Sequence, residues 1–407
     1  MSRLEQPTNE ACAIAEQGGG RATKVEQLIQ QYCPDGVEYK KLEDVCLMER
    51  GTSATKGTMQ EGDIPVISGG RQPAFYCSQS NRTGETITVA GSGAGAGYVQ
   101  YWDKPIFVCD AFSIKGNDSL NTKYIYYFLT SIQEKIYATK KGGGVPHVHI
   151  SSIDKFVIPV PPLPVQEEIV RILDNFAELQ AELQAELRKR IQQYNYYRDN
   201  LLSFEGRTDV EWKKLGDVAS IKTGRRFVRT DIRESGVPCF HYGDLYTYYG
   251  LTATQTKGYL DAELASKLRF AQPNDVVVVC AGENDMDIGV GVAWLGNEPA
   301  VVHDACCILH HDQNPRYISH FLRTHNYHLQ MKKYVKNGKI SSLPSSGLAN
   351  ALIPIPSLEE QERIATILDK FYALTTDITA GLPAEIEARR KQYEYYRDQL
   401  LTFKQKA

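Results

Sequence analysis

Apolar residues recur every three or four positions between residues 165 and 204, a stretch that contains neither glycine nor proline. Their mean step is about 3.6 residues, which predicts one long α-helix with a single apolar face. At a rise of about 1.5 Å per residue, such a helix extends roughly 60 Å. The apolar stripe consists of Phe176, Leu179, Leu183, Leu187, Ile191 and Tyr194.

A second stripe near the end of the chain starts with the same spacing, but Gly381 and Pro383 interrupt it. Because both residues disfavour a helix interior, we expect this helix to kink or break near 381–383. Each predicted helix has one apolar face, and the simplest way to bury both faces is to pack the helices against each other. The second stripe consists of Phe371, Leu374, Ile378, Leu382 and Ile386.

The remaining sequence contains short alternating segments separated by glycine-rich turns, a pattern typical of β-strands. Together with a few helical segments, it predicts two globular regions of mixed structure and an α+β fold class. In the first region we expect helices at 23–33 and 124–137, and strands at 64–70, 86–90, 98–102 and 156–160. In the second we expect strands at 239–242, 276–280, 290–295 and 300–309, and a helix at 316–334.

The two halves of the chain repeat each other. Residues 196–204 read YYRDNLLSF and residues 395–403 read YYRDQLLTF, while Asp110-Ala111 matches Asp304-Ala305. A repeat of this length indicates two similar halves, and therefore a bipartite target or a pair of identical partners. The spacing between matched segments changes mainly inside the globular regions, where loops tolerate insertions. The halves are thus predicted to share a frame and to differ in their loops.

These patterns divide the chain into five segments. We expect a loose leader at 1–22, a first globular domain at 23–163, a central helix at 164–206, a second globular domain at 207–356 and a C-terminal helix at 357–407.

Composition limits the possible classes of protein. The chain is 23% charged and 42% hydrophobic, as in ordinary soluble globular proteins. No apolar run reaches the length of a membrane span, and the nine cysteines lack a CxxC spacing, so we expect a cytoplasmic protein. The net charge is −3, so if DNA is the ligand, partners are expected to supply much of the backbone neutralisation.

Motifs for catalysis are weak. The glycine-rich stretch 91–97 resembles a phosphate cradle, but a strand pattern follows it where a nucleotide site needs a helix, so we interpret it as a β–β loop. Asp35 with Glu38 and Lys40 resembles a nuclease metal site only superficially, because the gap is too short. The histidines lack a suitably spaced carboxylate or cysteine partner. We therefore expect no catalytic residue, and no metal or cofactor bound by this chain.

Polar and basic loop residues remain, and these suit hydrogen bonds to base edges and phosphates. Each alone is more often a solvated loop residue, but their grouping in the divergent loops of both halves favours DNA contact. In the first half the candidates are Arg71, Gln72, Tyr76, Asn81, Arg82, Ser92, Lys140, Lys141, His147 and His149. In the second half they are Arg225, Arg226, Arg229, His241, Tyr242, Asn284, Lys336, Asn337, Lys339, Ser341 and Ser342.

The repeated Tyr-x-Tyr-Tyr-Arg blocks are aromatic and cationic, which suits a protein interface. Packing onto the adjacent globular domain is an equally good alternative. The interface candidates are Tyr194, Tyr196, Tyr197, Arg198, Tyr393, Tyr395, Tyr396 and Arg397.

The duplicated blocks, with three tandem tetrads of the Ala-Glu-Leu-Gln type at 177–188, resemble the specificity subunits of type I restriction–modification systems, closest to the type IC-like subclass. The resemblance implies two target recognition domains separated by two long helices packed as an antiparallel coiled coil. It implies that each domain reads one half of a split DNA site. It further implies two methylation subunits carrying S-adenosylmethionine, and motor-nuclease subunits for cleavage.

Two other classes of function stay open at this point. One is a stand-alone DNA methyltransferase or nuclease, although the cofactor and metal motifs for either are missing. The other is a coiled-coil scaffold without a DNA role, which leaves the divergence of the loops unexplained.

Overall fold

The computed structural model describes residues 23–406 apart from 283–286, 337, 339 and 378. The chain folds into two compact units. Unit 1 combines the described residues up to Glu182 with those from Ile386 onward, and unit 2 comprises Leu183–Glu385. The leader predicted at 1–22 lies outside the described residues.

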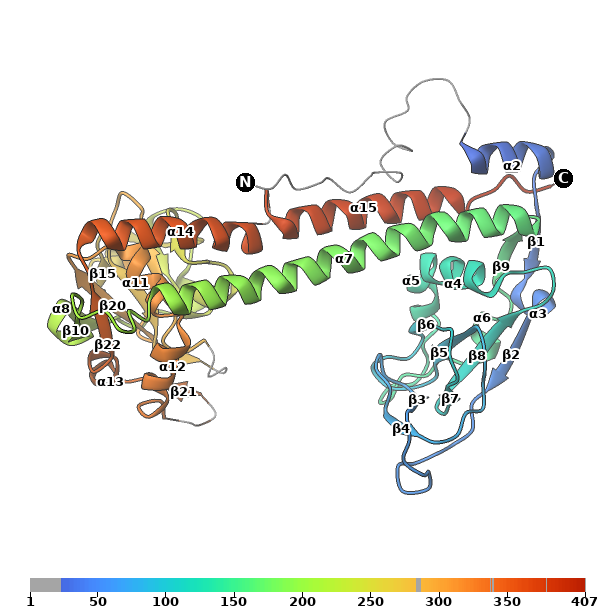
Figure 1. Ribbon diagram of the computed structural model, residues 1–407, viewed down its shortest axis with the longest axis horizontal. Coiled ribbons are helices and arrows are strands. Elements are labelled where there is room, and N and C mark those ends of the chain that lie inside the picture. The colour runs from blue at the N-terminus through green and yellow to red at the C-terminus, as the bar shows by residue number, and fades with distance from the viewer. Residues whose placement is uncertain (1–22, 283–286, 337, 339, 378, 407) are drawn as a thin grey trace. The chain divides into compact units, whose positions relative to one another are not determined.

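Unit 1 is built on a four-stranded antiparallel sheet in the order β2-β8-β5-β6 (Figure 1). A three-stranded sheet, β4-β3-β7, and a two-stranded sheet, β1-β9, complete its β structure. The elements are α2 (Lys24–Tyr32), β1 (Glu38–Lys41), α3 (Leu42–Val45), β2 (Cys46–Arg50), β3 (Ile64–Ile67), β4 (Phe75–Cys77), β5 (Thr86–Ala90), β6 (Val99–Trp102), β7 (Phe107–Val108), β8 (Ala111–Gly116), α4 (Thr122–Ser131), α5 (Gln133–Tyr137), α6 (Ile150–Ile153), β9 (Val157–Val160) and the first half of α7 (Leu163–Leu201).

The core of unit 1 lies between its sheet and α7. One face of α4 contributes Tyr124, Ile125 and Leu129, which pack with Ile87 and Ile114 of the sheet. The same cluster includes the first apolar residues of α7, so α4 lies between the sheet and the long helix. Asn121 caps α4, since its side chain accepts hydrogen bonds from the backbone of the first turn.

Unit 2 repeats this frame and adds strands to it. Its main sheet has the order β11-β20-β16-β18-β13, its second sheet β14-β12-β19-β15, and its two-stranded sheets are β10-β22 and β17-β21. The elements are β10 (Glu211–Lys214), α8 (Leu215–Val218), β11 (Ala219–Thr223), η1 (Arg229–Asp231), β12 (Val237–Phe240), α9 (Tyr242–Thr247), β13 (Thr252–Ala253), β14 (Gly258–Leu260), α10 (Ala262–Ala265), β15 (Phe270–Ala271), β16 (Val276–Val279), β17 (Ala281–Gly282), β18 (Gly291–Trp294), β19 (Ala300–Val302), β20 (Cys306–His311), α11 (Pro315–Phe321), α12 (His325–Lys332), β21 (Ser341–Ser342), α13 (Ser345–Ala349), β22 (Leu352–Ile355) and α14 (Leu358–Thr376).

Several sequence-predicted elements are shorter than expected. The helix predicted at 124–137 is two helices, α4 and α5, and the one at 316–334 is α11 and α12, because Thr324 starts a new cap after a turn. The strand predicted at 300–309 divides into β19 and β20 around a turn. The strand predicted at 239–242 ends at Phe240, because His241 caps the short helix α9.

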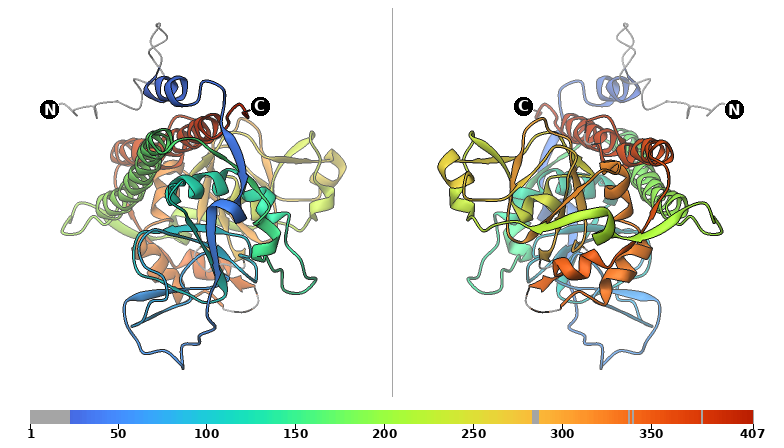
Figure 2. Two further views of the ribbon diagram at one scale, coloured as in Figure 1. Left: turned by 90° about the vertical axis from the view of Figure 1, so that its right-hand side faces the viewer. Right: turned by 90° about the vertical axis from the view of Figure 1, so that its left-hand side faces the viewer.

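Long helices pair antiparallel within each unit. In unit 1, Phe176 of α7 stacks on Tyr396 of α15 (Leu382–Leu400), with ring centroids 5.6 Å apart, while Leu401 joins the core near the start of α7. In unit 2, Tyr197 of α7 stacks on Phe371 of α14 at 5.3 Å. Figure 2 views each unit end-on. The stripe of α7 is unevenly covered, since Phe176 is buried and Ile191 is 40% exposed.

The second long helix is interrupted between α14 and α15. Between the two helices, the Asp377 carboxylate accepts hydrogen bonds from the backbone N–H groups of Thr379 and Ala380. These two N–H groups therefore have partners although they lie outside a helix. Pro383 lies in the first turn of α15, where its missing N–H is tolerated.

The last residues of the chain close unit 1. The backbone N–H groups of Val37 and Lys406 donate to the carbonyls of Lys404 and Val37, both at 2.9 Å. The Tyr39 hydroxyl donates to the Phe403 carbonyl at 2.8 Å. Residues 403–406 therefore belong to unit 1, although they are far in sequence from its globular part.

Candidate functional site

Four segments of unit 1 that are distant in sequence meet at one end of its main sheet. The backbone N–H of Gly91 donates to Asp110, that of Gly93 to Pro146, and that of Val148 to Gly91, each at 3.0 Å. Gly51 is the residue after β2 and packs closely against the end of β7. A Cβ atom at this position would lie 2.2 Å from the Cys109 carbonyl oxygen. These crossings leave an open cleft of about 350 Å³ between the segments.

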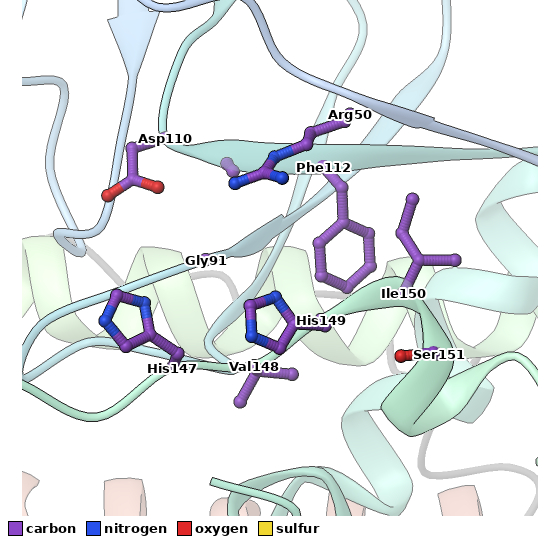
Figure 3. A pocket seen from close by; sticks show the side chains of 10 residues that line it. Arg50, Gly91, Asp110, Phe112, His147, Val148, His149, Ile150 and Ser151 are labelled. Atoms are coloured by element: carbon purple, nitrogen blue, oxygen red, sulfur yellow. The ribbon is translucent and has the colours of Figure 1, made fainter. Parts of the chain in front are cut away.

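Polar side chains face this cleft from two sides (Figure 3). Arg50 and Asp110 enter from the strand ends of the sheet, and His147 and His149 lie opposite them. The two imidazole rings are parallel within 2°, with centroids 6.0 Å apart. The Ser92 hydroxyl hydrogen-bonds to the Asp110 carboxylate, which fixes its orientation.

The cleft brings together two of the sequence-predicted residues, His147 and His149, with two that were missed, and the predicted Ser92 touches it through its hydrogen bond to Asp110. Arg50 is the last residue of β2 and Asp110 directly precedes β8. The sequence placed Asp110 in the repeat, but nothing in the surroundings of either residue marked it as a ligand-binding residue. Among the described residues, no ion pair or hydrogen bond engages the Arg50 guanidinium.

The loop carrying the predicted lysines is closed next to this cleft. The backbones of Lys141 and His147 exchange two hydrogen bonds, at 2.9 and 2.7 Å. The Lys140 ammonium lies 4.1 Å from the centroid of the Tyr137 ring, a cation–π contact. Lys141 is exposed.

The other candidates of unit 1 lie outside the cleft. Arg71, Gln72 and Tyr76 are exposed, and the Arg71 guanidinium lies over the Tyr98 ring at 5.0 Å. Their side chains are accessible to a ligand, but they do not line the cleft with Arg50.

Asn81 and Arg82 instead hold the fold of unit 1. The Asn81 amide both donates to and accepts from the backbone of Val108, at 2.9 and 2.7 Å. Arg82 donates from Nε to the Ser113 hydroxyl at 2.8 Å and pairs with Glu49 at 3.3 Å. Their hydrogen-bonding groups are occupied within the chain, contrary to the expectation that they are available to DNA.

In unit 2 the predicted arginines follow a glycine that matches Gly51. Gly224 is as close to the neighbouring strand, since a Cβ atom would lie 2.2 Å from the His303 carbonyl oxygen. Arg225, Arg226 and Arg229 follow it and are exposed, with Arg225 donating to the Lys267 carbonyl at 2.7 Å. This exposed basic segment suits phosphate contacts.

His241 and Tyr242 belong to an aromatic cluster beside these arginines. The ring centroids of His241 and His303 are 4.9 Å apart, and Phe227 lies 5.1 Å from His303. Burial lowers the pKa of both histidines, so they are held in the neutral form. Contrary to expectation, His241 is buried and caps α9, while Tyr242 is half-buried.

The loop of Lys336 repeats the closure seen in unit 1. The backbones of Lys336 and Ser342 exchange hydrogen bonds at 2.8 and 3.0 Å, as Lys141 and His147 do. Lys336 is exposed, Ser342 is half-buried, and Ser341 is buried in β21. The candidates Asn284, Asn337 and Lys339 lie outside the described residues.

The repeated tyrosine–arginine blocks divide into buried and exposed members. Tyr194 and Arg198 are buried, and the Tyr194 hydroxyl hydrogen-bonds to Nδ1 of His320 at 3.0 Å. Burial raises the pKa of Tyr194 to about 12. These two residues thus fit the packing alternative and are not presented to a partner in this conformation.

The outward members occupy matching places in the repeat. Tyr196 is 64% exposed and Tyr395 is 62% exposed. Tyr197 and Tyr396 each stack on a phenylalanine of the paired helix. The remaining interface candidates, Tyr393 and Arg397, are half-buried and form a cation–π contact at 5.7 Å.

Other site types find no support in the described part of the chain. No group of three or more histidine, cysteine, aspartate or glutamate residues there is arranged to hold a metal ion. No helix in the same residues is both long and apolar enough to cross a bilayer.

Comparison with known proteins identifies the family. Residues 34–193 and 208–388 match the type I restriction modification DNA specificity domain. The specificity subunit of the Escherichia coli type I enzymes EcoR124I and EcoR124II is 35% identical over 296 residues, which are 69% of this chain and 70% of that protein. A putative specificity subunit of Haemophilus influenzae is 29% identical over 400 residues, 90% of this chain and 96% of the relative.

Solved structures agree on the fold. A type I restriction–modification S subunit from M. genitalium superposes with a TM-score of 0.53 at 18% identity, covering 90% of this chain and 95% of that one. A chain from a study of complex assembly in the type I system superposes with a TM-score of 0.56 at 18% identity, covering 90% of this chain and 98% of that one. This chain belongs to the specificity subunits of type I restriction–modification systems, their non-catalytic DNA-recognition components.

Proposed function

We propose that each unit of this chain reads one half of a split, asymmetric DNA site. The observation that carries this proposal is a common backbone frame with unlike side chains. Gly51 and Gly224 lie equally close to a neighbouring strand, and the Lys141 and Lys336 loops close with the same two hydrogen bonds. The residues presented by these frames differ between the units, as two unlike half-sites require.

The experiment that tests this proposal maps adenine methylation across the genome of a host that carries the chain. The expected result is a recognised DNA sequence, called the DNA word below, that consists of two parts with an unread gap between them. Replacing Arg225 and Arg226 by alanine should weaken methylation of the whole site through lost phosphate contacts, without altering the first half of the word. A continuous word, or no word, contradicts the proposal.

The long helices are proposed to set the gap between the half-sites. Deleting Ala181–Gln184 removes one tetrad, which is a rotation of about 40° and a rise of about 6 Å. By rotation this matches one base pair of B-DNA, and by rise nearly two. A rotational error misaims every reading side chain, so we expect the gap to shorten by one base pair in the methylation map. An unchanged gap contradicts the role of the helices as a spacer.

The helices are also proposed to dock two methylation subunits, which carry S-adenosylmethionine, with motor-nuclease subunits joining for cleavage. The exposed tyrosines at matching places, Tyr196 and Tyr395, support two equivalent docking sites. Native mass spectrometry should show two methylation subunits on the parent chain, one on either single Tyr→Ala variant, and fewer still on the double variant. The exposed Gln192→Ala serves as a control that retains both copies.

The alternative hypothesis is a stand-alone methyltransferase, and one experiment distinguishes it from the proposed assembly. The purified chain incubated alone with labelled S-adenosylmethionine and DNA should transfer no label. Transfer by the chain without partners contradicts the proposed division of labour.

A further inference from the structure

The cleft of unit 1 has a composition that does not suit a phosphate. Arg50 contributes one positive charge and Asp110 one negative charge, and both face the same opening. A phosphate that approached Arg50 would meet the Asp110 carboxylate, which the Ser92 hydroxyl holds in place. A ligand that accepts hydrogen bonds on one side and donates on the other satisfies both groups.

The edge of a G·C base pair in the major groove has this pattern. Guanine presents two adjacent acceptors, O6 and N7, which match the two-pronged arginine fork, and cytosine presents its N4 amino group as a donor to a carboxylate. An A·T pair has no two adjacent acceptors on one base. We propose that Arg50 and Asp110 read a G·C pair, Arg50 from the guanine and Asp110 from the cytosine. This inference rests on the proposed reading of one half-site by unit 1.

Unit 2 lacks this pair at the matching positions. Unit 2 has one residue more in this turn, because His303 matches Cys109 beside the close-packed glycine while Ala305 accepts from the N–H of Cys280 as Asp110 accepts from that of Gly91; Asp304 and Ala305 therefore share the place of Asp110. By the same frame, Thr223 replaces Arg50 before the matched glycine. The G·C reader is therefore a property of one half of the chain.

His147 and His149 complete the opposite wall of the cleft. Their parallel imidazole rings can donate or accept hydrogen bonds through their nitrogen atoms, which suits contact with a neighbouring base or sugar. In unit 2 the position of His147 is taken by Ser342. The matching places of the two units thus differ in side-chain size as well as in charge.

The test selects preferred sequences from random duplexes with the full chain assembled with its methylation subunits. The parent complex should select a two-part word with a G·C pair in one half. Arg50→Thr, which copies unit 2, and Asp110→Asn should each reduce discrimination at that same pair by between about 5-fold and about 100-fold, and leave the other half unchanged. Asp118→Asn, an exposed carboxylate outside the cleft, is the matched control and should retain the parent word.

Arg50→Lys separates base reading from phosphate contact. Lysine keeps the charge and loses the fork, so a base reader predicts a broadened word even if Arg50→Thr does not fold. Because lysine can also donate to guanine, the decisive result combines two measurements: a parent word with Arg50→Lys together with unchanged affinity of the parent complex for 7-deazaguanine duplexes assigns Arg50 to the DNA backbone and overturns the inference. With 7-deazaguanine at the sensitive position, the parent complex should lose about 5-fold or more in affinity, and Arg50→Thr should lose nothing further.

The outcomes distinguish this inference from the proposed function. A parent word that is not divided into two parts refutes the reading of half-sites, and the cleft assignment with it. A two-part word that the cleft variants leave unchanged, broaden in both halves, or broaden at an A·T pair refutes the G·C reader alone.

Discussion

One buried glutamine in each unit fastens the long helix to the globular part, and its removal tests the shared frame. Gln166 near the start of α7 is fully buried. Its Nε2 donates to the carbonyls of Pro161 and Ser119 at 2.6 and 2.9 Å, and its Oε1 accepts from the N–H of Asn121 at 2.8 Å. The side chain thus joins the end of β9, the turn before α4 and the cap of α4.

Gln361 makes the same kind of junction in unit 2. Its Nε2 donates to the Pro356 carbonyl at 2.9 Å and to the side chain of Gln313 at 2.8 Å, and its Oε1 accepts from the N–H of Asn314 at 3.0 Å. Three hydrogen bonds at roughly 1 kcal/mol each give about 3 kcal/mol lost on substitution by alanine, and buried groups left without partners add to this loss. We expect a similar loss in both units.

The assay is amide hydrogen exchange followed by mass spectrometry, because it reports stability locally. A loss of about 3 kcal/mol corresponds to exchange roughly 150-fold faster at amides that open with the junction. Gln166→Ala should accelerate exchange in α4 and spare α11, and Gln361→Ala should do the reverse. The exposed Gln192→Ala is the control, and an effect on α4 below about 5-fold would refute the reasoning for Gln166.

Three further predictions concern stability and pH. Deleting residues 403–407 removes four hydrogen bonds to Val37 and Tyr39, one of them long at 3.4 Å, and should destabilise unit 1 by about 3 kcal/mol or more, seen as faster exchange in β1 with α11 unchanged. Burial lowers the pKa of the fully buried His320, so at acidic pH this histidine is protonated in the unfolded chain but not in the folded unit. The free energy of unfolding of unit 2 should therefore be greatest above about pH 6.5 and decrease as the pH falls below that value. His320→Gln should flatten that slope in denaturant titrations between pH 7.5 and 5.5, and an unchanged slope would assign it to other groups. Asn81→Ala should lower the stability of unit 1 by about 2 kcal/mol in the same titrations and leave the DNA word unchanged, because both amide contacts go to Val108.

The long helices and the repeat could be predicted from the sequence because both are periodic signals. The predicted helix at 165–204 is confirmed by α7, and the glycine-rich stretch after Ala90 is confirmed as a β–β loop. The short elements were less predictable. A sequence pattern does not show that Thr324 or His241 caps a new helix, since capping depends on where the chain turns.

The candidate site was predictable only in part, for a physical reason. Arg50, Asp110 and His147 are brought together by backbone hydrogen bonds between segments far apart in sequence. A polar residue such as Asn81 looks the same in sequence whether its amide pairs with a strand or faces solvent. Composition therefore located the polar loops, but it could not say which of their side chains were occupied.

The way the cleft is held is compatible with the two unlike readers that we propose. The contacts that position the loops are largely backbone hydrogen bonds, together with a buried glutamine at the base of each unit. Arg50 and Asp110 contribute little to that frame, so substitution there alters what the cleft can bind at small cost in folding stability. Because the same frame tolerates Thr223 in place of Arg50 in unit 2, folding does not depend on the residue at this position. If the cleft reads a half-site as proposed, a change of its specificity requires few substitutions, and those substitutions leave the contacts of the long helices intact.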